Sequence, residues 1–198
     1  MIDGRPEAAL DSTGLEASVR SAHYARRRRD GNRRYRKRKH PKLTLVCHTA
    51  SHLIAAALAT VGPSYDVGLF EPAMVRASWN LEIDRLLADA GYDSEANHRL
   101  AREGLGIRST VIRLNRRGRF RARTGGRSRL PAGKYRRQMA ARFPRRKYGQ
   151  RWQAESVISR VKRRLGAALR GRSDEARQRE SDLRVFTHDL MILAGSSP

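Results

Sequence analysis

Apolar residues gather in short runs along the chain, and their spacing alternates between the period of strands and that of helices. The runs at 43–47 (LTLVC) and 53–60 (LIAAALAT) flank a polar turn and predict a β-hairpin, although alanines weaken the second strand. Further strands are predicted at 7–11, where a Ser-Thr-Gly turn follows, and at 86–88 and 108–114.

Four segments carry helical spacing or helix-start signals. They are 71–83, a segment capped by Asp93 or Ser94 that runs to about Glu103, 148–169, and 180–194. The last contains one apolar stripe that predicts an amphipathic helix, formed by Leu183, Phe186, Leu190 and Leu193. The order of elements predicts an α/β fold, a mixed sheet flanked by helices.

Two arginine-rich stretches have no usable periodicity. Residues 23–42 predict a loop or extended β-hairpin that touches phosphate, or a disordered segment, and residues 115–147 predict a flexible, DNA-facing insertion before the last helices. Tyr24 and Tyr35 are either base-stacking residues or ordinary surface tyrosines. The first stretch also holds four candidate phosphate contacts: Arg33, Arg34, Arg36 and Lys37.

The chain is strongly basic, because 43 Lys and Arg face 19 Asp and Glu among 198 residues, a net charge of +24. Such a surface attracts polyanions, so nucleic acid is the expected partner, and a basic structural protein that binds RNA is the competing class. The single cysteine, Cys47, lies in an apolar run and predicts a buried thiol in a reducing compartment, which favours the cytoplasm. No Cys/His spacing suggests zinc, and no apolar run is long enough to span a membrane.

One acidic residue stands alone within this charge. Residues 104–173 contain 23 Lys and Arg and a single carboxylate, Glu155. On a helical wheel, a polar stripe within about 60° of arc is formed by Tyr148, Arg151, Glu155 and Lys162, next to a separate apolar sector. The simplest interpretation is an Arg–Glu pair four residues apart on a solvated helix face.

Two further acids favour a metal site instead. Asp11 and Asp89 each follow a short apolar strand and precede a glycine-containing turn, the position at which ligands bind α/β sheets. If the two strands are neighbours, the carboxylates converge, and Glu155 completes a set of oxygen ligands suited to Mg²⁺ or Mn²⁺. Two such ions can activate a water or a 3′-hydroxyl against a phosphodiester.

The sequence resembles the DDE transposases of insertion sequences over about residues 7–194. The spacing Tyr148-x2-Arg151-x3-Glu155-x6-Lys162 is that family's YREK signature, while LDSTGL (10–15) and LADAGYDSEANHRL (87–100) are similar to its first and second aspartate motifs. KLTLVCHTASHLI followed by GPSYD (62–66), and the closing VFTHDLMIL, with Asp189 in place of the usual Asn, are also similar to the family.

The resemblance implies a ribonuclease-H-like fold in which Asp11, Asp89 and Glu155 bind two Mg²⁺ or Mn²⁺ ions. It also implies that Tyr148, Arg151 and Lys162 hold the phosphates of the transposon end. The implied reaction is hydrolysis at the element's ends, often through a DNA hairpin, followed by strand transfer into target DNA. A homodimer in the DNA synapse and a prokaryotic host are further implications.

Several alternatives remain open in the sequence. Asp93 competes with Asp89 as the second acid, although a helix cap suits it better. Trp152 is a candidate DNA contact that stacks on a flipped base, or it packs beside the apolar stripe, and His188 suits a packed position better than a catalytic one.

The chain also departs from the family's pattern at its start. Family members carry an N-terminal helical region before the first aspartate, and here only ten residues precede Asp11. The chain is therefore expected to be truncated, and the competing function is an inactive remnant that only binds DNA. A nuclease of the same fold, which cuts without joining, is the related alternative.

Overall fold

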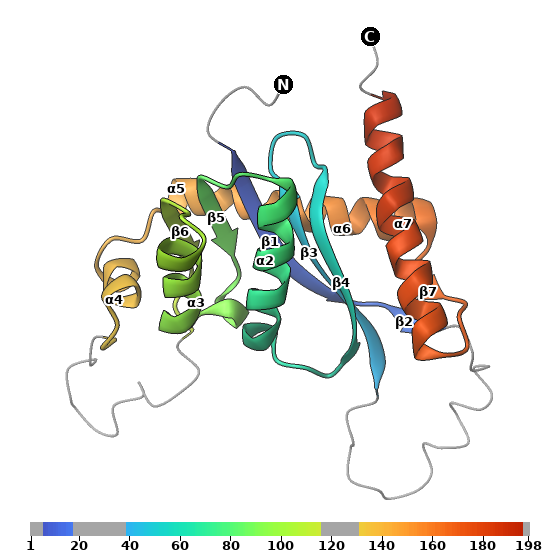
Figure 1. The fold of residues 1–198 in the computed structure, drawn as a ribbon, viewed down its shortest axis with the longest axis horizontal. Coiled ribbons are helices and arrows are strands. Elements are labelled where there is room, and N and C mark those ends of the chain that lie inside the picture. The colour runs from blue at the N-terminus through green and yellow to red at the C-terminus, as the bar shows by residue number, and fades with distance from the viewer. Residues whose placement is uncertain (1–5, 18–38, 116–130, 196–198) are drawn as a thin grey trace, which may run out of the picture.

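Five strands form the central sheet of the computed structural model, which describes residues 6–17, 39–115 and 131–195. The spatial order is β4-β3-β1-β5-β6 (Figure 1). In chain order the strands are β1 (Glu7–Gly14), β3 (His40–His48), β4 (Ile54–Gly62), β5 (Arg85–Ala88) and β6 (Ser109–Ile112). Because β1 runs antiparallel to β3 and parallel to β5, the sheet is mixed.

Helices cover both faces of this sheet (Figure 1). On one face α2 (Phe70–Asn80) packs Phe70 and Met74 against strand residues such as Leu10, as part of one buried cluster. On the other face α6 (Trp152–Leu165) buries Val157 in a second cluster, together with Ala9. The α/β fold predicted from the sequence is therefore confirmed.

The remaining elements are short or lie at the edges. They are β2 (Glu16–Ala17), η1 (Asp66–Leu69), η2 (Ala90–Tyr92), α3 (Glu95–Arg99), the π-helical turn η3 (Leu100–Gly104), α4 (Lys134–Ala141), α5 (Arg145–Tyr148), η4 (Gly149–Arg151), β7 (Ala168–Leu169) and α7 (Asp174–Gly195). Within the described residues, no helix is long and apolar enough to cross a membrane.

The predicted β-hairpin, the short strand before Asp89 and the Ser94-capped helix are confirmed, since the Ser94 hydroxyl accepts the Asn97 N–H at 3.0 Å. The Cys47 thiol is buried as expected. Several boundaries were wrong. The helix predicted from 148 begins at Trp152, after two short helical turns, and the helix predicted from 180 begins at Asp174. The helix predicted at 71–83 ends at Asn80, and the helix predicted to reach 169 ends at Leu165, because Gly166 takes a φ of 95°.

The first strand is longer than predicted. Ser12, Thr13 and Gly14 do not turn but continue β1, because they pair with Thr44, Leu43 and Lys42 of β3. Asp11 therefore lies within a strand rather than at its end. Asp11 nevertheless has no partner in β5, because the parallel pairing of the two strands stops at Leu10 and Ala88.

The insertion predicted at 115–147 contains regular structure in its described part. Helix α4 begins where Glu95 accepts the backbone N–H groups of Tyr135 and Arg136 at 3.1 and 3.0 Å. The Asp93 carboxylate accepts from the Arg136 guanidinium at 2.7 Å, and its side chain has no exposed surface. Asp93 and Glu95 thus anchor α4 from about 40 residues earlier in the sequence, and no local pattern could indicate such contacts.

Helix α7 covers the edge strand β4, a common protection of a strand edge. The Asp189 carboxylate accepts the Ile54 N–H at 3.1 Å, and His188 is buried at the same level, as predicted. The predicted apolar stripe of this helix faces solvent instead of the core. Its four side chains, Leu183, Phe186, Leu190 and Leu193, are exposed by 49–65%.

His98, beside the α4 anchor, predicts a loss of stability in mild acid. Burial, opposed by Asp93, lowers the pKa of His98 to about 4. Between about pH 6.5 and pH 4, the unfolded chain is therefore protonated at this residue while the folded protein is not. The unfolding free energy should fall by about 3 kcal/mol from this group as pH drops from about 6.5 to about 4. Urea unfolding across this range should show a shallower pH dependence in His98→Gln. The same pH dependence of the unfolding free energy in both proteins would contradict the prediction.

Candidate active site

The strand register places Asp11 and Asp89 side by side. β1 and β5 pair in parallel up to Leu10 and Ala88, so the next residue of each strand is one of the two aspartates. Side chains alternate between the two faces of a strand, so Asp11 lies on the same face as Ala9 and Asp89 on the same face as Leu87. Ala9 and Leu87 both pack in the cluster that contains α6. The two carboxylates therefore belong to the α6 face of the sheet.

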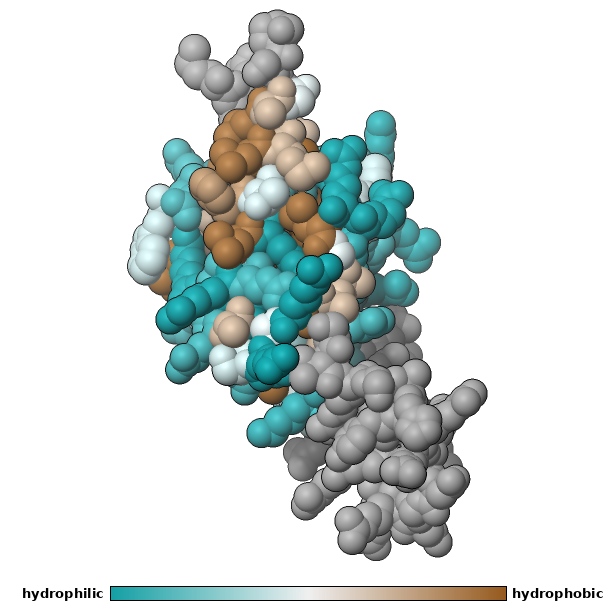
Figure 2. Space-filling model, turned by 90° about the vertical axis from the view of Figure 1, so that its right-hand side faces the viewer, coloured by the Kyte–Doolittle hydropathy of each residue, from teal (hydrophilic) through white to brown (hydrophobic). Residues whose placement is uncertain are grey.

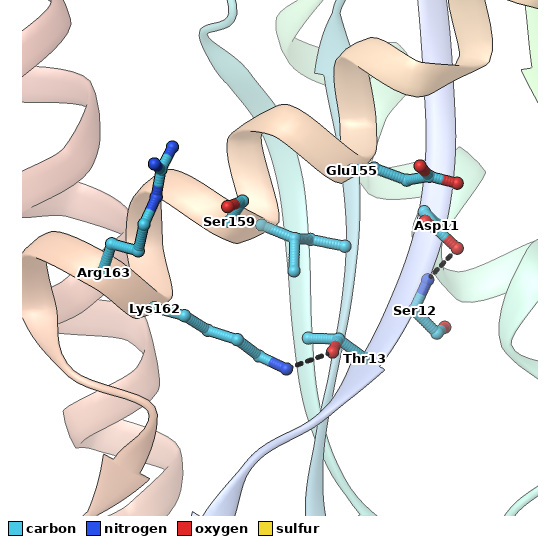
Figure 3. Close-up of a pocket in the computed structure, with 8 residues that line it drawn as sticks. Asp11, Ser12, Thr13, Glu155, Ser159, Lys162 and Arg163 are labelled. Atoms are coloured by element: carbon cyan, nitrogen blue, oxygen red, sulfur yellow. Dashed lines mark hydrogen bonds between the residues drawn. The ribbon is translucent and has the colours of Figure 1, made fainter.

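Glu155 reaches the same place from α6. The helix is held over β1 and β3 by its buried apolar residues, which include Ala154 and Val157 on either side of Glu155. The Glu155 side chain itself remains about half exposed. Figure 3 shows its carboxylate beside that of Asp11.

One guanidinium joins these two acids. Arg151 ends the short turn that leads into α6; its Nη1 lies 3.5 Å from Asp11 Oδ2, and its Nη2 donates to Glu155 Oε1. The simple interpretation from the sequence, an Arg–Glu pair on a helix face, is thus correct but incomplete. Because a single cation bridges both carboxylates, the two lie close enough to share one.

The electrostatics of Asp11 indicate a crowded anionic site. Burial raises the pKa of Asp11 to about 6, the Ser12 N–H and Arg151 oppose this shift, and the charges of Glu155 and Asp89 add to it. The ionised form of Asp11 is therefore costly unless a cation is near. Asp93 has no such role, because it is committed to Arg136 and to the Asn115 N–H. The expectation that Asp93 caps a helix was also wrong, since Ser94 is the cap of α3.

The donor set fits a hard divalent ion in its chemistry, since all three groups are carboxylates. In the described ranges, no three acidic, histidine or cysteine side chains gather closely enough to hold an ion as they stand. The guanidinium on Asp11 and Glu155 nevertheless marks where a cation is attracted.

A pocket of about 460 Å³ adjoins the two acids (Figure 3). The carboxylates of Asp11 and Glu155 lie at one end, and the Lys162 ammonium lies at the other. Lys162 Nζ donates to Thr13 Oγ1 at 2.6 Å and to the Gly14 carbonyl at 2.9 Å, so its charge is fixed beside β1. The pocket therefore has two carboxylates at one end and a fixed ammonium group at the other.

Tyr148 and Trp152 flank the start of α6. The Tyr148 ring packs against Phe143 at 4.9 Å between centroids, and burial raises the pKa of Tyr148. Trp152 is 53% exposed, so the interpretation of this residue as a core residue was wrong. Its aromatic face is open to a ligand.

The structure does not test the other predicted contacts. Arg33, Arg34, Arg36, Lys37, Tyr24 and Tyr35 lie outside the described residues. Reasoning from the sequence also missed several residues that line the pocket, among them Thr13, Ser159 and Arg163. Extending the strand alternation from Asp11 and the helical wheel from Glu155 would have found them.

A mixed five-stranded sheet between helices, with acids on two adjacent strands and on a late helix, matches the architecture of the ribonuclease-H-like fold. Residues 3–190 match the family model of the transposase DDE domain. The chain belongs to this family, whose members carry out DNA transposition and generally use divalent metal ions. A search among curated proteins finds no match to the chain.

Proposed function

We propose that the chain is the catalytic domain of an insertion-sequence transposase of the YREK type. It would cut DNA at the ends of its element and transfer the freed strand into target DNA. The observation that carries the proposal is the bridging of Asp11 and Glu155 by Arg151, with Asp89 next to Asp11. Two acids bridged by one guanidinium, with a third acid at the end of the neighbouring strand, are difficult to explain in a chain of net charge +24 that only binds polyanions.

Asp11, Asp89 and Glu155 would hold two Mg²⁺ or Mn²⁺ ions. When bound, such ions supply an activated water or 3′-hydroxyl and stabilise the leaving oxygen of the phosphodiester. The raised pKa of Asp11 supports this assignment, because an ionised carboxylate near other anions gains most from a cation.

The cationic residues would position the DNA. Lys162, fixed by Thr13 and Gly14, lies at the far end of the pocket from the acids and suits a phosphate one or two nucleotides away. Arg151 would move from the carboxylates to a phosphate once metal neutralises them. The Tyr148 ring would help to hold Arg151, because its centre lies 5.8 Å from the guanidinium carbon. The exposed Trp152 would stack on a base.

The basic segments, including Arg33, Arg34, Arg36 and Lys37, would contact DNA outside the pocket. Two copies of the chain would act on the two ends of the element. This work on chromosomal DNA would place the protein in the cytoplasm of a prokaryote, at the nucleoid.

The decisive experiment incubates the protein with a duplex that carries the ends of its own element, in Mg²⁺, Mn²⁺ or Ca²⁺. We expect cleavage and joined products in Mg²⁺ or Mn²⁺ and binding alone in Ca²⁺. Cleavage without joining would indicate a nuclease of the same fold. Tight, salt-sensitive binding without cleavage in any metal would identify an inactive, DNA-binding remnant and refute the proposal.

A further inference from the structure

The most unusual surface of the molecule is the outer side of α7. Figure 2 views the protein from this side and shows apolar side chains gathered along the upper part of the helix. They are Leu183, Phe186, Leu190 and Leu193, exposed by 65%, 61%, 49% and 54%. The inner side of the same helix buries the polar Ser181 and His188, with the partly buried Val185 packed against the core between them. We call the four apolar residues the α7 stripe.

The outer side of this helix is therefore unusually apolar for a surface. Scattered exposed leucines need no explanation, but a contiguous exposed apolar stripe marks a contact surface. The intervals along the stripe are three, four and three residues, the spacing by which one helix packs against another. The stripe is therefore built to receive a helix.

The pattern of the stripe is symmetric about His188. Leu183 and Leu193 lie five residues on either side of it, and Phe186 and Leu190 lie two residues on either side. Two copies of α7 that meet antiparallel across a two-fold axis would place Leu183 against Leu193 and Phe186 against Leu190. A two-fold interface uses the same patch on both partners, and this patch meets that condition.

Charge also selects a second copy of the chain. With a net charge of +24, two copies repel each other over most of their surfaces. Residues 183–195 contain only one basic and one acidic residue, Arg184 and Asp189, so this part of the surface has no net charge. Asp189 is occupied by Ile54 and His188, and Arg184 donates to the Gly166 and Ala168 carbonyls.

We propose that the α7 stripe is a homotypic interface through which two copies of the chain pair antiparallel. Four side chains provide less area than the roughly 800 Å² per partner of a stable interface, so the pair is weak in free solution. DNA that holds two chains together raises their effective concentration and strengthens it. The role of this pair in joining two element ends rests on the proposed function, whereas the pairing itself does not.

Site-directed cross-linking tests the geometry. The background variant is Cys47→Ala, which removes the only cysteine, and Leu183→Cys and Leu193→Cys are introduced separately. A short bis-maleimide should link the two chains in a mixture of both variants, with more product when a long duplex is present, and give little product with either variant alone. Links between identical positions only would indicate a parallel pair and overturn the proposal, and so would no link in any combination.

Substitution tests the energetics. Phe186→Asp in the cross-linking background should remove the product and shift the sedimentation of the DNA-free chain towards the monomer. Leu190→Asp should do the same from a second position. The matched control is Trp79→Asp, which changes an exposed aromatic residue of α2, 75% exposed, and should leave pairing intact.

Unfolding temperature separates an interface from a structural role. Because Phe186 is 61% exposed, Phe186→Asp should leave the thermal unfolding of the dilute protein unchanged. Unfolding at a clearly lower temperature, or equal loss of pairing in Trp79→Asp, would overturn the proposal. The cross-links should also form with Glu155→Gln and without metal, so failed catalysis would not be mistaken for failed pairing.

Discussion

Replacing Glu155 by glutamine is expected to abolish DNA cleavage while the protein stays folded and still binds DNA. The substitution removes one of the three carboxylates that would hold metal, and metal ions supply several kcal/mol of transition-state stabilisation. The rate should therefore fall by about 10³-fold or more. DNA affinity should remain equal or rise slightly, because the change removes a negative charge beside the pocket.

A matched control exists in α7. Asp174 is an exposed acid paired with Arg177 three residues away, much as Glu155 is paired with Arg151, so Asp174→Asn removes a similar surface ion pair. Both substitutions should change stability by less than about 1 kcal/mol. Single-turnover cleavage in Mn²⁺ and thermal unfolding measure the two effects. Unchanged cleavage in Glu155→Gln, or a strong loss in Asp174→Asn, would remove Glu155 from the active site.

Asp11→Asn should make the protein more stable and inactive. The folded-state pKa of about 6 lies above the ordinary value of 3.8, so stability falls as pH rises between these two values, and the loss is complete above about pH 6. Asparagine resembles the protonated acid. At neutral pH the variant should exceed the wild type in unfolding free energy by about 2 kcal/mol. This difference should vanish below about pH 4, where Asp11 is protonated in both states.

Divalent metal should stabilise the folded wild type, whereas ionisation of Asp11 destabilises it. Mg²⁺ or Mn²⁺ binds the folded wild type and should raise its unfolding temperature at pH 7.5, with a much smaller effect on Asp11→Asn. Thermal unfolding with and without metal, at pH 7.5 and at pH 4, tests both statements. Glu155→Gln serves as a control for stability, since that side chain is half exposed and should give no comparable gain. A destabilised Asp11→Asn at neutral pH would show that the carboxylate is structural.

These two predictions describe one physical compromise. Burial, and to a lesser degree the neighbouring acids, make the ionised form of Asp11 costly, and Arg151 offsets this cost only partly. Active sites commonly sacrifice stability in this way, because the groups that bind a cation repel one another in its absence.

The sequence by itself determined the class of the protein. Alternating apolar runs specified the β-hairpin and the strand before Asp89, because strand periodicity is a local property. The wheel of 148–165 grouped Arg151, Glu155 and Lys162 for the same reason, although Tyr148 and Arg151 lie in the short turns before α6. The excess of positive charge and the motif spacing then indicated a protein that acts on DNA.

The tertiary structure alone decided how distant residues meet. Register between β1 and β5 set Asp11 beside Asp89, and Arg151 bridged Asp11 only because α6 lies across that strand. Asp93 and Glu95 anchored α4 through contacts about 40 residues apart in the sequence. The direction of the α7 stripe could not be read from its periodicity either. Spacing shows which residues share a side of a helix, but only packing decides which side is buried.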